Sequence, residues 1–161
     1  MTIKSTLIEQ FDSAYDQSAW FVSALDAVKE ISAEEAAWKP EADIHSVAEL
    51  VVHLNFWNER WLRRFRGEEV GSAEMEVAET FLMDAADWNK TLERFIAIMN
   101  EWRSLLTEAD DEKFSELVSV KIPDEWASPI AQMNIHNAYH VGQIVLVRKL
   151  HGSWDANLGV S

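Results

Sequence analysis

Residues 128–152 read SPIAQMNIHNAYHVGQIVLVRKLHG and predict one long helix, around which the rest of the chain can be arranged. Its opening Ser128-Pro129 pair is typical of a helix start, with serine as the N-cap and proline at the first helical position. Gly152 suits the residue that ends such a helix. No Asp, Glu, Lys or Arg occurs between residues 126 and 147, so we expect this helix to be buried.

Two histidines make this apolar helix unusual. His136 and His140 are four residues apart, which places their side chains about 5–6 Å from each other on one helix face. A buried imidazole needs a partner, because an unpaired buried polar group costs about 1–3 kcal/mol. A metal ion is one such partner. The pair alone is a weak signal for a metal, and hydrogen-bonded or solvent-exposed histidines are its commoner interpretation.

Composition excludes several classes of protein. The chain has 161 residues, of which 48% are hydrophobic, and this predicts one folded domain over residues 1–161. A net charge of −14 disfavours nucleic acid and anionic membranes as partners. Cysteine is absent, so any metal site must use His, Asp or Glu. The N-terminus lacks the apolar core of a signal peptide, and the long uncharged run contains too many polar residues for a membrane span. We therefore expect a cytoplasmic protein.

Few residues interrupt helices, since there are only 3 Pro and 5 Gly. Apolar residues spaced by three and four predict an all-α fold, a four-helix bundle with long connectors between helices two and three and between helices three and four. The expected helices span Lys4–Glu30, Ser46 to about Gly67, Asp84 or Ala85 to Glu108, and residues 128–152.

The connectors have weaker patterns. Glu68–Met83 is acidic and is expected to hold at most a short helical turn. Within Asp110–Trp126, the sequence FSELVSVKIP favours a short extended piece, for which no pairing partner stands out. The last helix has a second apolar side beside its main seam. It is therefore either the most buried helix or part of a subunit interface, which makes a homodimer an expectation.

A third histidine strengthens the metal hypothesis. His53 lies in the middle of the second helix, at a depth from the helix start that can match that of His140 in the fourth. Three neutral imidazoles with an open coordination position are typical of a catalytic metal, whereas structural zinc sites normally have four protein ligands. Bundles place such sites between facing helices. Buried histidines without a metal are the competing interpretation.

The segment His136-Asn-Ala-Tyr-His140-Val-Gly142-Gln143 resembles the H-x-x-x-H-x-G-Q signature of the DinB/YfiT-like metalloenzymes. The context of the second-helix histidine, SVAELVVHL at residues 46–54, is also similar to theirs, as is the Trp38-x-Pro40 connector. The resemblance covers essentially the whole chain. It implies that His53, His136 and His140 bind a divalent ion, zinc or nickel, with an open position for water or substrate.

The resemblance implies two chemistries acting on a small-molecule substrate. One is metal-dependent hydrolysis, and the other is transfer that uses a low-molecular-weight thiol. No Ser-His-Asp set or general-base carboxylate stands out, so the ion would do most of the work. The alternative is a non-catalytic, dimeric metal-binding bundle with a role in sensing, storage or stress.

Further residues have both structural and functional interpretations. Gln143 is a tentative catalytic residue that would face the metal water or orient substrate, or else a buried amide bonded to another helix. Glu49 would fix the His53 tautomer or, more simply, form a capping box with Ser46. The remaining candidates are expected to be mainly structural or solvated: Trp57, Trp61 and Trp126 as core or pocket mouth, Arg60, Arg63 and Arg64 as a helix end or an anion site, Asn137 and Tyr139 as packing or surface residues, and His45 and His151 as solvated side chains.

Overall fold

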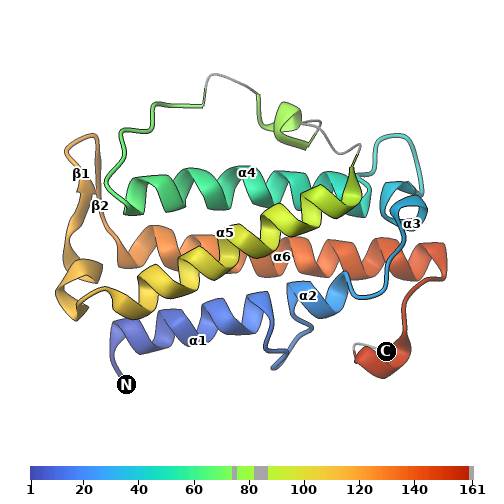
Figure 1. The fold of residues 1–161 in the computed structure, drawn as a ribbon, viewed down its shortest axis with the longest axis horizontal. Coiled ribbons are helices and arrows are strands. Elements are labelled where there is room, and N and C mark those ends of the chain that lie inside the picture. The colour runs from blue at the N-terminus through green and yellow to red at the C-terminus, as the bar shows by residue number, and fades with distance from the viewer. Residues whose placement is uncertain (74–75, 82–86, 160–161) are drawn as a thin grey trace.

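A computed structural model describes residues 1–73, 76–81 and 87–159 of the chain (Figure 1). Its long helices are α1 (Ile3–Tyr15), α4 (Val47–Phe65), α5 (Trp88–Glu108) and α6 (Ala127–His151). They pack side by side as a bundle, in which α4 contacts α5 and α6, and α1 contacts α5 and α6. The predicted all-α bundle is confirmed. Among the described residues, no helix combines the length and apolar character that a membrane span requires.

Short elements join these helices. Between α1 and α4 lie α2 (Ala24–Ala27) and α3 (Ala33–Ala37). The 3-10 turn η1 (Val77–Phe81) lies in the predicted connector between α4 and α5, where the sequence predicts a short helical turn. The segment between α5 and α6 contains the turn η2 (Asp111–Ser115) and the strands β1 (Leu117–Ser119) and β2 (Ile122–Glu125), and η3 (Ala156–Leu158) follows α6.

The first predicted helix is wrong in its length, because α1 ends at Tyr15 rather than at Glu30. Polar side chains compete with the helical backbone here. The Ser18 hydroxyl accepts a hydrogen bond from the Ser23 backbone N–H at 3.0 Å and donates to Asp26 at 2.6 Å. Ser23 in turn caps α2. Side chains that satisfy the backbone locally favour turns over helix interiors, and Ser18 is accordingly exposed.

Helices α4 and α5 follow the prediction closely. The Ser46–Glu49 capping box is present at the start of α4, with the Glu49 N–H donating to the Ser46 hydroxyl at 3.2 Å. Helix α5 ends at Glu108 as expected. The predicted start of this helix at Asp84 or Ala85 lies outside the described residues.

The start of α6 lies two residues before the predicted one. The helix begins at Ala127, so Ser128 and Pro129 lie inside its first turn, and Ser128 is not the N-cap. The residue before the helix is Trp126, whose backbone N–H donates to the Glu116 carbonyl at 3.0 Å and so belongs to the preceding hairpin. The end of the helix is confirmed, because Gly152 has a left-handed φ of 86° that favours glycine.

The extended piece expected between α5 and α6 has a partner within the same connector. Strands β1 and β2 form an antiparallel pair in which Leu117 faces Glu125 and Ser119 faces Ile122. The prediction found no partner because the second strand contains Pro123 and two acids, Asp124 and Glu125, which are uncommon in strands. The short connection between the strands brings them together despite this composition.

The core lies between the four long helices, all of which contribute buried apolar side chains. Its largest fully buried side chains include Trp102, Trp126, Phe11 and Phe95. A pair of buried amides joins α4 to α6, with Asn58 and Asn137 donating to each other's oxygen atoms at 2.9 and 3.0 Å. Because buried amides need matched partners, this pair sets the register between the two helices. That register positions the histidines.

Candidate metal centre

Three histidines meet between α4 and α6. His53 comes from α4, one turn and a little more before Asn58, while His136 and His140 flank Asn137 on α6. The His136 Nε2 atom lies 3.1 Å from the Nε2 atom of His53 and 3.1 Å from that of His140. His53 and His140 are buried, and His136 is half-buried. The structure thus brings together the three residues that the sequence singles out.

The tautomer of His53 follows from its hydrogen bonds. Its Nδ1 atom lies 2.6 Å from the hydroxyl oxygen of Thr80, and that hydroxyl donates its single proton to the Val77 carbonyl at 2.6 Å. Thr80 must therefore accept, and His53 Nδ1 must carry the proton. The Nε2 atom of His53 is then left with a lone pair that points toward the other two histidines.

Gln143 has the same effect on His140. The Gln143 amide Nε2 donates to the Tyr139 hydroxyl at 3.2 Å, and in this orientation its Oε1 lies 2.6 Å from His140 Nδ1. His140 Nδ1 is therefore the donor, and its Nε2 also carries a lone pair. Among the described residues, the side-chain hydrogen bonds of Gln143 go to His140 and Tyr139, both in α6. Gln143 supports one of the predicted ligands, a role that the sequence interpretation did not consider.

These lone pairs fit a metal ion. Nitrogen ligands about 2.0–2.1 Å from a tetrahedral ion lie about 3.4 Å from one another, close to the 3.1 Å spacings of the Nε2 atoms. Without an ion, His136 Nε2 can carry one proton, while His53 Nε2 and His140 Nε2 both need a donor. At least one of the two short contacts between nitrogen atoms therefore has no proton between them. The outer hydrogen bonds to Thr80 and Gln143 are those expected around metal-ligating histidines.

Burial keeps the three imidazoles neutral. It lowers the pKa of His53 to about 3 and that of His136 to about 4, with further lowering by the neighbouring histidines. The pKa of His140 is also lowered, again chiefly because burial disfavours the charged ring. Metal ligation requires neutral imidazole. The site is therefore in its ligating protonation state at neutral pH.

Aromatic stacking fixes the orientation of His53. The Phe81 ring lies parallel to the His53 ring with centroids 3.9 Å apart, and His45 stacks on the other face of Phe81 at 3.8 Å. Phe81 and Thr80 both belong to η1, so this one turn holds His53 by ring and by hydrogen bond. The sequence interpretation missed both residues. They lie in a weakly patterned connector, and no local signal links them to a histidine so far away in the chain.

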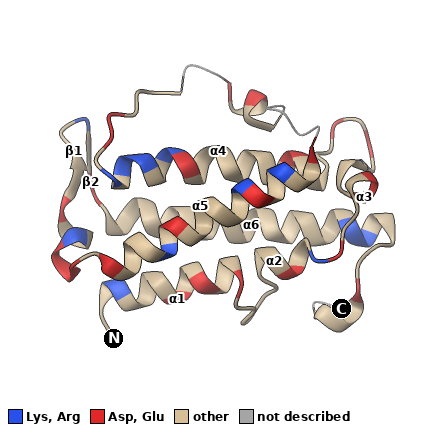
Figure 2. Cartoon of the chain, viewed as in Figure 1, with Lys and Arg blue, Asp and Glu red and all other residues tan. Residues whose placement is uncertain are grey.

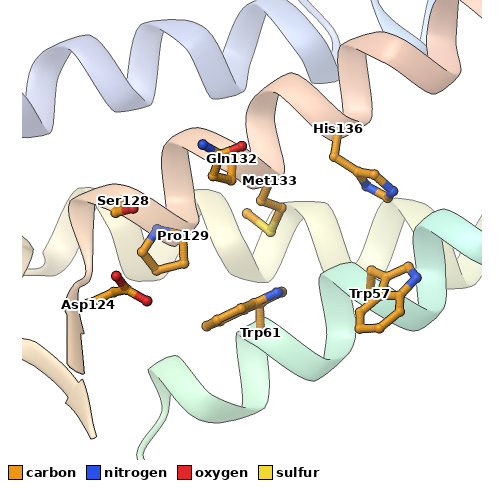
Figure 3. A pocket seen from close by; sticks show the side chains of 8 residues that line it. All are labelled: Trp57, Trp61, Asp124, Ser128, Pro129, Gln132, Met133 and His136. Atoms are coloured by element: carbon orange, nitrogen blue, oxygen red, sulfur yellow. The ribbon is translucent and has the colours of Figure 1, made fainter. Parts of the chain in front are cut away.

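A pocket of about 360 Å³ opens beside the cluster and reaches His136 (Figure 3). Most of its lining surface is apolar, with Trp57 and Trp61 of α4 facing Met133 and Pro129 of α6. Its size falls in the range of small-molecule sites. Figure 3 shows His136 at one end of the pocket and Asp124 at the other.

The structure also settles the role of Glu49. Its carboxylate accepts from the Ser46 backbone N–H at 2.9 Å and from Lys39 at 3.1 Å, and it lies 3.3 Å from His45. It therefore belongs to the capping box, and Thr80 occupies the place beside His53 that Glu49 was considered for. His45, which was expected to be solvated, is half-buried and lies between Glu49 and Phe81.

The other candidates divide between core, surface and pocket. Trp126 is buried in the core, whereas Trp57 and Trp61 line the pocket. The three arginines at the end of α4 bond to the loop that follows: Arg63 to Glu68, and Arg60 and Arg64 to the Gly71 carbonyl. This contact with the loop matches the helix-end interpretation. Tyr139 is exposed as expected, and His151 is exposed but packs edge-on against Trp38.

Comparison with known proteins places the chain in a family. The sequence profile of the DinB superfamily matches residues 17–144. A solved structure, described as the conserved protein of a locus from Enterococcus faecalis, has a TM-score of 0.72 and 15% sequence identity, covering 93% of this chain and 97% of that one. This likeness shows a shared fold. No curated protein matches the chain significantly. With most of its length matched by the family profile, the chain belongs to the DinB superfamily.

Proposed function

We propose that His53, His136 and His140 hold one divalent metal ion and that the adjoining pocket binds the small molecule on which the protein acts. One observation carries this proposal: the outer hydrogen bonds leave lone pairs on His53 Nε2 and His140 Nε2 that converge on His136. Because His136 can donate to only one of them, at least one of these two buried lone pairs lacks a partner unless a cation lies between them. The pocket reaches this point through His136.

This donor set suits zinc, nickel or copper, and the family resemblance makes zinc and nickel the first candidates. Neutral imidazole suits late first-row divalent metals, and no thiolate or carboxylate competes within the cluster of described residues. When bound, such an ion acts as a Lewis acid that lowers the pKa of a coordinated water or thiol. The chain's own contribution is to keep three imidazoles neutral, oriented and shielded from bulk water.

The residues around the pocket favour a thiol as the activated group. Among the described residues that line it, Asp124 is the only carboxylate, and it lies at the end opposite His136 (Figure 3). None of the described lining residues therefore offers a carboxylate base beside the histidines. A thiol has an ordinary pKa of about 8.5 and needs little help to ionise at neutral pH, whereas the pKa of water must fall from about 15.7 to about 7. Thiol-dependent transfer to an electrophile is thus our first candidate reaction.

Metal-dependent hydrolysis is the second candidate, because a strongly polarising ion can activate water without a protein base. In either reaction, the two pocket tryptophans would bind an apolar part of the substrate by flat contact. Aromatic walls of this kind exclude water and strengthen electrostatic interactions near the reacting atoms. A non-catalytic metal-binding role remains the alternative, in which the same pocket would bind no substrate.

Metal analysis of tag-free protein tests the binding step. We expect one zinc or nickel ion per chain, and substitution of His53, His136 or His140 by alanine should weaken binding by more than about 100-fold, because each removes a ligand. His151→Ala is the matched control, since His151 is exposed and is not part of the cluster. Unchanged stoichiometry and affinity in His53→Ala would contradict the three-ligand site.

Activity assays then separate the candidate functions. The metal-loaded protein is incubated with low-molecular-weight thiols plus electrophiles, and separately with activated esters and amides. Turnover that requires thiol and is lost in His140→Ala supports transfer, and turnover without thiol supports hydrolysis. Tight metal binding without either activity supports the non-catalytic alternative.

A further inference from the structure

We infer that Asp124 selects substrates that carry a positively charged group at the end remote from the metal. The inference rests on the proposed function in one respect, because it takes the reacting end of the substrate to lie beside His136. It adds the chemical class of the substrate, an elongated molecule with an apolar middle and an ammonium or guanidinium group at its far end. The shape of the pocket, the position of its one charge and the charge of the whole chain support it.

The pocket is elongated, and its two ends differ in chemistry. His136 lies at one end and Asp124 at the other, where Ser128 in the first turn of α6 also lines the pocket (Figure 3). From residue 128 to residue 136 the helix advances by about 12 Å. Between the two ends the lining is mostly apolar, with Trp61 of α4 facing Met133 of α6. A molecule that fills this pocket is therefore long and apolar in its middle.

Asp124 is the one charged side chain among the described residues that line the pocket. His136 is neutral, because burial lowers its pKa to about 4. No described residue donates a hydrogen bond to the Asp124 carboxylate or forms an ion pair with it, and the Ser128 hydroxyl and the Gln132 amide are likewise without a partner there. The oxygen atoms of all three side chains can accept, and an ammonium group has three protons to donate. This end of the pocket therefore suits a cation.

Packing of a neighbouring residue holds Asp124 at the pocket. Two residues after it, Trp126 is buried and packs edge-on against Trp61 and Phe65 of α4, with ring centroids 6.2 and 4.9 Å away. This contact anchors the end of β2 to the same helix that forms one wall of the pocket. The carboxylate is therefore in place before a ligand arrives, and binding does not have to order it.

The charge of the whole chain favours a cationic ligand over an anionic one. The net charge is −14, and Figure 2 shows acidic residues on α1, α4 and α5 and in the connectors. A field of this sign attracts cations and repels anions. Arg64 is a basic residue near the pocket, stacked on Trp61 with its Cζ atom 4.9 Å from the ring centroid. It donates to the carbonyls of Val70 and Gly71, however, and is not among the described lining residues. Asp124 is thus the charge that a bound molecule meets.

Three linear alkanethiols of equal length test the inference, with an amine, a hydroxyl or a carboxylate at the end opposite the thiol. Calorimetric titration of the metal-loaded protein measures their dissociation constants. We expect the amine to bind about fivefold more tightly than the hydroxyl analogue, the upper end of what an exposed ion pair contributes, because Asp124 is exposed to solvent. The carboxylate analogue should bind most weakly. The preference for the amine should shrink as salt is added, since salt screens an exposed pair.

Variants identify Asp124 as the source of the preference. Asp124→Asn should abolish the preference for the amine, and Asp124→Lys should reverse it in favour of the carboxylate. Glu125→Gln is the matched control, because it removes the same charge from the next residue of β2. Successive side chains of a strand point to opposite faces, and Glu125 is not among the described residues that line the pocket. This variant should keep the preference for the amine.

Metal-free protein separates failure of this inference from failure of the proposed function. There, an alkylamine and an alcohol of the same length, both without a thiol, report on the Asp124 end alone. A preference for the amine that Asp124→Asn abolishes supports the inference. If the metal-loaded protein then binds the thiol-bearing amine no more tightly than the plain alkylamine, the thiol reaction is contradicted and the cation end still stands. The inference would be overturned by an absence of binding, by equal binding of amine and alcohol, or by Glu125→Gln removing the preference as fully as Asp124→Asn.

Discussion

His53 and His136 belong to the same cluster but are held in different ways. The His53 ring is buried, stacks on Phe81 and donates from Nδ1 to Thr80 at 2.6 Å. His136 is half-buried, lines the pocket, and its Nδ1 atom takes part in none of the hydrogen bonds found among the described residues. One histidine is therefore oriented by its surroundings before any ion binds, and the other depends on the cluster itself.

This difference shows how the site combines rigidity with access. The η1 turn closes the side of the cluster at His53, and Gln143 supports His140. The side at His136 adjoins the pocket, where a ligand would approach. Preorganised ligands lower the cost of metal binding, while an accessible ligand leaves room for exchange and for substrate. The following predictions test whether the two histidines differ as the contacts indicate.

The largest effect is expected when either histidine is removed. His53→Ala and His136→Ala should each weaken metal binding by more than about 100-fold, because both are ligands. In the metal-free protein, however, His53→Ala should lower the free energy of unfolding by about 2–3 kcal/mol through the cavity beside Phe81, whereas His136→Ala should change it by less than about 1 kcal/mol. Urea unfolding with chelator present measures this. Equal losses of stability would show that the two rings are held alike.

A smaller effect is expected when the outer partner of His53 is removed. Thr80→Val keeps the shape of the side chain but removes the hydrogen-bond acceptor, and it should weaken metal binding about 10- to 100-fold. Thr80→Ser should restore binding. Calorimetric titration with zinc or nickel measures both.

Glu49→Gln serves as the control for this comparison. Because Glu49 caps α4 and does not contact His53, this change should cost about 1 kcal/mol of stability or less without altering metal affinity. The comparison fails if Thr80→Val binds metal as the wild type does, or if Glu49→Gln weakens metal binding as much as Thr80→Val.

The smallest effect is expected from pH. The pKa values of His53 and His136 in the folded protein are about 3 and about 4, below the ordinary value of 6.5. At pH values between the lowered pKa and 6.5, each of these histidines binds more protons in the unfolded chain than in the folded one. The stability contributed by the neutral rings is thus fully present above pH 6.5 and is lost as the pH falls. Between pH 6.5 and 5.5, each of the two histidines should lower the free energy of unfolding of the metal-free protein by about 1 kcal/mol.

Variants identify the groups that cause this pH dependence. His53→Asn and His136→Asn should each flatten the decline in stability below pH 6.5, as measured by urea unfolding in the presence of chelator. His151→Asn should not, because His151 is exposed. The predicted neutral rings would be contradicted if the free energy of unfolding fell between pH 6.5 and 5.5 by the same amount in the wild type and in the double variant of His53 and His136.

Much of the fold follows from periodicity in the sequence. The spacing of apolar residues predicts α4 nearly to both ends and α5 to its C-terminal end, and Gly152 marks the end of α6. Where the prediction failed, the causes are local hydrogen bonds and strand pairing, which apolar spacing does not report. Hydrogen bonds among Ser18, Ser23 and Asp26 end the first helix early, although the apolar spacing continues through them. A hairpin forms between α5 and α6 from a strand whose composition disfavours strands.

The sequence by itself determined the helical class and the two histidines four residues apart, because both depend on the regular geometry of a helix. It also placed His53 in the middle of a second helix. Only the tertiary structure decided that these side chains meet, since the register of α4 against α6 depends on the buried Asn58–Asn137 pair. It also decided the tautomer of His53, because Thr80 is distant in the chain and becomes its neighbour only through packing.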